Sequence, residues 1–107
     1  MGNPFAGEVG LVIDGQRRVL KLTLGALAEL EVALGTDTLV ALVERFESAA
    51  YSSSDVMALI VAGLRGGGWQ GRAEDLLTAD IEGGPMVAAR VGAELLARAF
   101  VVPGDVG

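Results

Sequence analysis

The sequence predicts an α+β fold, mostly α, with an N-terminal β-hairpin packed on four to five short helices. Two apolar runs flank an Asp-Gly pair near the N-terminus, which is typical of a hairpin. Most of the remaining chain repeats its apolar residues at helical spacing, with breaks rich in Gly, Ser and Pro between the repeats. The length of 107 residues and the hydrophobic fraction of 51% suit one domain over 1–107. We expect an ordered core over about 7–100 and flexible ends.

The hairpin is predicted from Asp14-Gly15, which lies between an apolar run over 9–13 and a second run over 19–24. Asp-Gly suits a two-residue turn because both central residues of that turn take positive φ. An isolated hairpin is only marginally stable in water, so we expect this one to lie on the helices.

The first two helices are predicted from their boundary residues. Thr23 can cap a helix whose leucines recur at helical spacing, and Gly35 follows that helix where a residue with positive φ is common. Asp37 is placed to cap the second helix, which carries apolar residues over 39–46.

Three further helices are expected. Ser52 and Asp55 have the spacing of a capping box and open a helix that ends at Gly66. A short helix is expected over 74–79. Pro85 suits the first position of the last helix, which carries a regular apolar stripe up to Phe100.

The composition disfavours several classes of function. The chain has no histidine and no cysteine, which removes the commonest general base, metal ligand and thiolate nucleophile. A net charge of −6 disfavours binding to nucleic acid or to an anionic membrane. No signal peptide or membrane-spanning segment is visible. We therefore expect a non-enzymatic cytoplasmic protein with no cofactor, metal site or small-molecule substrate.

Three groups of residues allow a functional and a structural interpretation. The glycines over 66–71 match Gly-x-Gly-x-x-Gly but follow a predicted helix, which favours a helix stop over a phosphate site. Ser52–Ser54 are interpreted as cap and loop residues. Trp69, the only tryptophan, is interpreted as a core residue or as an exposed anchor for a partner.

Acidic and small residues form two further patterns. Acids over 29–47 are interpreted as a solvated face, which could complement a basic partner. Small residues spaced by four in the last helix favour close packing, either within the molecule or against a partner helix.

Two motifs carry a resemblance to a known family: Leu-Thr-Leu-Gly-Ala-Leu-Ala-Glu-Leu-Glu over 22–31 and Ala-Gly-Leu-Arg-Gly-Gly-Gly over 62–68. With the hairpin before them and Glu-Leu-Leu-Ala-Arg-Ala-Phe over 94–100 after them, the chain resembles the small tail protein of gene transfer agents, the phage-like particles of alphaproteobacteria. The similarity covers 7–100. The family is described both as a tail tube protein and as a tail assembly chaperone.

The resemblance implies a role in tail morphogenesis of a gene transfer agent or prophage. A chaperone would bind the tape-measure protein and the tail tube protein, and the predicted helical fold favours this alternative. A structural tube subunit is the other alternative, and it would be found in the particle tail. The oligomeric state, including a homo-oligomer, stays open.

Five residues of the two motifs and the following loop are our candidates for partner binding: Leu27, Leu30, Glu31, Arg65 and Trp69. No catalytic, cofactor-binding or metal-binding residue is predicted.

Overall fold

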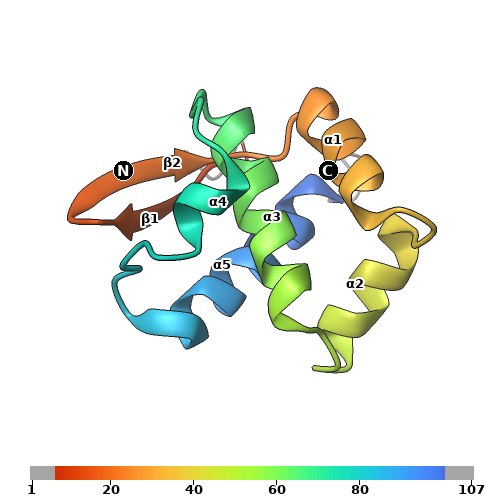
Figure 1. The fold of residues 1–107 in the computed structure, drawn as a ribbon. Coiled ribbons are helices and arrows are strands. Elements are labelled where there is room, and N and C mark those ends of the chain that lie inside the picture. The colour runs from red at the N-terminus through yellow and green to blue at the C-terminus, as the bar shows by residue number, and fades with distance from the viewer. Residues whose placement is uncertain (1–6, 101–107) are drawn as a thin grey trace, which may run out of the picture.

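The computed structural model describes residues 7–100, and it confirms the predicted mostly helical α+β fold with an N-terminal hairpin. The elements along the chain are β1 (Val9–Ile13), β2 (Gln16–Leu20), α1 (Leu24–Leu34), α2 (Leu39–Glu47), α3 (Ser53–Gly66), α4 (Ala73–Leu76) and α5 (Gly84–Ala99). Figure 1 shows α3 in the middle, with the hairpin and α4 to one side and α1 and α2 to the other. The predicted flexible ends, 1–6 and 101–107, lie outside the described residues.

The hairpin turns at Asp14-Gly15 as predicted, with φ of 52° and 78°. The strands are antiparallel, and Val9 pairs with Leu20 at their open end. The second strand therefore covers 16–20, so only residues 19 and 20 of the predicted run over 19–24 belong to it. A two-residue turn starts β2 directly after Gly15, and β1 offers no partner beyond Leu20.

A segment distant in sequence covers the other edge of β1. Ile13 and Ile81 form an antiparallel bridge. The Asp14 backbone N–H donates to the Asp80 carbonyl at 2.8 Å, and the Asp80 N–H donates to Asp14 Oδ1 at 2.8 Å. The loop between α4 and α5 is thereby attached to the hairpin turn.

Glycines in α3 allow its C-terminal turn to pack directly on the backbone of β2. The Lys21 N–H donates to the Gly63 carbonyl at 2.9 Å. A Cβ at Gly66 would overlap the Lys21 carbonyl oxygen, and a Cβ at Gly67 would overlap that of Val19. The helix ends at Gly66 as predicted, and Gly67 is its C-cap. The glycine run is thus also a packing surface.

The helix caps agree with the predictions at two of three positions. Thr23 Oγ1 accepts from the Ala26 N–H at 3.1 Å. Ser52 and Asp55 form the predicted capping box of α3. At α2 the prediction is wrong, because the helix begins one residue later than an Asp37 cap would require and Thr38 caps it instead.

The core lies where α3 crosses the hairpin, α1 and α5. Its largest fully buried side chains come from β2 and from four of the helices, namely Leu20, Leu30, Leu42, Leu59, Ile60, Leu64 and Leu95. Some of the small residues of α5 pack within the molecule, and contact of the others with a partner helix stays a prediction. Ala88 and Gly92 are buried, and a Cβ at Gly92 would lie 3.3 Å from Leu59 Cδ1, whereas Ala93 and Ala97 are exposed.

Candidate functional site

The five residues predicted to bind a partner do not form one exposed surface. Leu30 is 1% exposed and belongs to the core, so its assignment to an exposed surface is corrected. Leu30 lies on the side of α1 that faces α3. The helical spacing of the leucines alone does not show which of them face the core and which face solvent. Leu27 is half-buried, while Glu31 and Arg65 are exposed.

Trp69 is half-buried and packs against the core, which favours the core interpretation of this residue. It lines a small hollow beside the hairpin and α4, apart from α1. The ring stands over Gly71, where a Cβ would overlap it. Partner binding by Leu27, Glu31, Arg65 and Trp69 stays a prediction.

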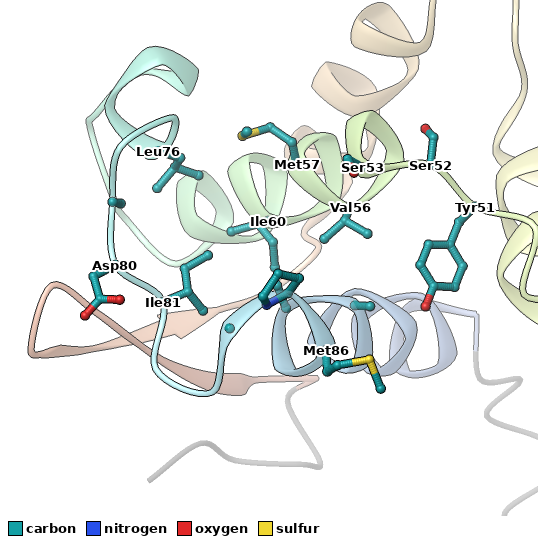
Figure 2. A pocket seen from close by; sticks show the side chains of 15 residues that line it. Tyr51, Ser52, Ser53, Val56, Met57, Ile60, Leu76, Asp80, Ile81 and Met86 are labelled. Carbon is teal, nitrogen blue, oxygen red and sulfur yellow. The ribbon is translucent and has the colours of Figure 1, made fainter.

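A groove lies between α3, the first turns of α5 and the loop that precedes α5 (Figure 2). We call it the α3–α5 groove, and its volume is about 540 Å³. Val56 and Ile60 point into it from α3, and Ile81 approaches from the loop. Alanines of α5 complete a lining that is mainly apolar.

An aromatic pair and a loop attached to the hairpin form the two ends of this groove. At one end Tyr51 stacks on Phe46, with ring centroids 4.5 Å apart. At the other end the loop is attached to the hairpin turn through Asp80. Gly83, with φ of 88°, turns the chain into α5. The helix begins at Gly84, so Pro85 is its second residue and not the first as predicted; its ring is still tolerated in this first turn, where the backbone N–H groups have no partner within the helix.

Methionines lie on the groove wall where they remain accessible. Met86 is 82% exposed although it belongs to an otherwise well-packed helix. Met57 is half-buried on α3. Flexible thioether side chains adapt to partners of different shape, so their presence is typical of a binding surface.

A second groove lies on the other side of Met57, between α1, α3 and α4. We call it the α1–α3 groove, and its volume is about 520 Å³. Two of the predicted residues, Leu30 and Arg65, line it, and Leu77 on its wall is 70% exposed. Arg65 Nη1 lies 3.6 Å from Glu29 Oε1 at its rim.

The charged pair with the shortest contacts has a structural role. Arg45 Nε and Nη2 donate to the two carboxylate oxygens of Asp55 at 2.9 Å and 3.0 Å, and Arg45 Nη1 contacts Asp37 at 3.0 Å. The hydrogen bonds from Arg45, together with the Ser52 N–H, hold the pKa of Asp55 below its usual value, although burial opposes the shift. This network holds α2 against the start of α3.

The other motifs have local structural roles. The glycines over 66–71 begin at the last residue of α3 and lead to the four-residue α4, so they do not connect a strand to a helix as a dinucleotide site requires. Ser52 caps α3. The acids Glu29, Glu31, Glu44 and Glu47 are all exposed.

Within 7–100 no group of three or more His, Cys, Asp or Glu side chains is placed to hold a metal ion. None of the helices in that range has the length and apolar character needed to cross a membrane.

Sequence reasoning did not predict the residues that give the α3–α5 groove its character. Met86 is an apolar residue that lies outside the apolar stripe of α5. This placement could have identified it from the sequence as an exposed apolar residue. Asp80 and Ile81 had no such signal, because only the pairing of the loop with β1 brings them to the groove.

The chain matches one family model over residues 6–101, and that family is described as "Phage tail tube protein, GTA-gp10". Searches of the curated proteins and of the solved structures gave no match.

Proposed function

The chain belongs to this family of phage tail proteins, and from this premise we propose that it is a tail assembly chaperone of a gene transfer agent or prophage. In this role it binds the tape-measure and tail tube proteins while the tail is built, and it performs no chemical reaction itself. It acts in the cytoplasm of the bacterial host.

The observation that supports the chaperone best is the pair of apolar grooves on either side of Met57. Grooves between helices bind amphipathic helices by receiving apolar side chains spaced three or four residues apart. A long helical protein such as a tape-measure protein presents many such segments. Coverage of these segments would keep it soluble until tube subunits assemble around it.

The state of the sheet edges supports the same alternative. Among the described residues the sheet has two strands, and the bridge at Ile81 covers one edge of β1. The C-terminal turn of α3 covers the edge of β2 near Lys21. Ring and tube assembly through sheet extension needs open strand edges, and these two edges are already occupied in part.

A structural tube subunit is the second candidate, and the family description favours it because it names a tail tube protein. A subunit of this kind would form stable rings or tubes and would remain in purified particles. A chaperone would form soluble complexes and leave before the particle matures.

Co-expression with the tape-measure and tail tube proteins of the same gene cluster tests the proposal. A soluble complex on size exclusion with light scattering, together with aggregation of the tape-measure protein when this chain is omitted, would support the chaperone. Rings formed by this chain without the tape-measure protein, or its retention in purified particles, would favour the tube subunit. A monomer that leaves the solubility of the tape-measure protein unchanged would contradict the chaperone.

A further inference from the structure

We propose that the α3–α5 groove is the specific docking site for one amphipathic helix of the partner, and that this helix places a Lys or Arg against Asp80. This inference rests on the proposed function, because it assigns the tape-measure helix to one of the two grooves. The partner is thus defined by its chemistry: an apolar stripe with a basic residue at one end.

The lining of the groove defines the apolar part of the partner. Val56, Ile60 and Ile81 form an apolar floor in the middle, between Asp80 at one end and Tyr51 at the other (Figure 2). A volume of about 540 Å³ can receive several aliphatic side chains from one face of a helix. Met86, at 82% exposure, can fold over a bound helix and lose much of that exposed surface.

The charge of the groove defines the basic part of the partner. Among the described residues that line this groove, Asp80 is the only charged one. Two hydrogen bonds with Asp14 hold its backbone in place. Within 7–100 its carboxylate has no hydrogen bond or ion pair in the structure, so it can receive a cation from a partner.

The α1–α3 groove fits a cationic partner less well. Its charged rim residues, Glu29 and Arg65, already face one another at 3.6 Å. A partner cation there would compete with Arg65 for Glu29 and would meet a like charge. The unpaired acid therefore favours the α3–α5 groove.

Three charge-introducing substitutions at exposed apolar positions locate the site. Met86→Asp changes the α3–α5 groove, Leu77→Asp changes the α1–α3 groove, and Val32→Asp on the outer face of α1 is the matched control. The wild-type residues are 82%, 70% and 81% exposed, so we expect all three variants to fold, which circular dichroism would verify. Each adds the same charge to the chain.

Binding is measured with the co-purified tape-measure protein and with overlapping fluorescent peptides that cover its sequence. We expect Met86→Asp to weaken binding of one basic amphipathic peptide about tenfold or more, and Val32→Asp and Leu77→Asp to change it less than threefold. Asp80→Lys should weaken it to a similar degree. Exchange of the facing Lys or Arg of the peptide for Glu should restore binding to Asp80→Lys.

The outcomes separate this inference from the proposed function. If wild-type protein binds the tape-measure protein and Met86→Asp and Asp80→Lys bind it equally well, the groove assignment is wrong and the chaperone stands. If Leu77→Asp or Val32→Asp alone abolishes binding, the site lies on α1 or the α1–α3 groove. If wild-type protein forms a dimer that Met86→Asp dissociates, a second copy occupies the groove. Absence of any complex with wild-type protein contradicts both proposals.

Discussion

Substitution of Gly66 by alanine tests whether the glycine run of α3 is a packing surface. In an open helical position alanine stabilises a helix by about 0.5–1 kcal/mol relative to glycine. At Gly66 the new Cβ would overlap the Lys21 carbonyl oxygen and would lie 3.3 Å from the Ala26 Cβ. The structure can accommodate it only by moving α3 away from β2, so the sign of the effect reverses.

The magnitude follows from two losses. Forcing an extra carbon into a close-packed contact costs about 1–3 kcal/mol. The neighbouring hydrogen bond from the Lys21 N–H to the Gly63 carbonyl, at 2.9 Å, contributes about 1 kcal/mol and would be stretched by the same movement. After the gain in helix propensity is subtracted, Gly66→Ala should destabilise the protein by about 2 kcal/mol.

Urea unfolding followed by circular dichroism and by the fluorescence of Trp69 measures this change. In a separate thermal unfolding experiment, the melting temperature should fall by about 8–15 °C for a domain of this size. Gly25→Ala in α1 is the matched control, because within 7–100 the nearest side-chain atom to its new Cβ is Thr23 Oγ1 at 3.9 Å. We expect it to be neutral or up to about 1 kcal/mol more stable. A Gly66→Ala protein as stable as the control would refute the packing argument.

Three further predictions concern local interactions. Ser52→Ala should lower the free energy of unfolding by about 1 kcal/mol, measured in urea, because the α3 capping box is lost. Asp55→Asn should flatten the acid limb of stability against pH. Arg45 lowers the pKa of Asp55 in the folded protein. The ionised carboxylate therefore stabilises the fold at pH values above its usual pKa near 3.8, and this stabilisation is lost as the pH falls below 3.8 through the lowered pKa. Equal acid unfolding of both proteins would contradict this assignment. Asp14→Gly should cost about 1 kcal/mol in thermal unfolding, since it keeps the turn but loses the hydrogen bond to the Asp80 N–H; Asp14→Asn should be nearly neutral.

Local signals predicted most of the secondary structure because each acts over a few residues. Asp14-Gly15 specifies a tight turn through positive φ, and Ser52 with Asp55 satisfies the first N–H groups of α3. The errors also have local causes. Asp37 and Thr38 are both good caps, and the sequence pattern did not distinguish which of them α2 would use.

The candidate site depended much more on tertiary structure. Leu30 belongs to a stripe that the sequence could place on either a core or a partner surface, and only its position against α3 shows that it is buried. The partner-binding candidates were chosen from the two motifs. In the structure, however, part of the second motif serves the contact between α3 and β2.

By itself, the sequence determined the mostly helical fold with its hairpin, the resemblance to a phage tail family and the lack of histidine and cysteine. These properties depend on composition and on residues close together along the chain. Only the tertiary structure decided that Asp80 and Met86 lie at the same groove as Val56. Their meeting depends on the pairing of Ile81 with β1 and on the packing of α5 against α3, contacts between segments far apart in sequence that no local pattern encodes.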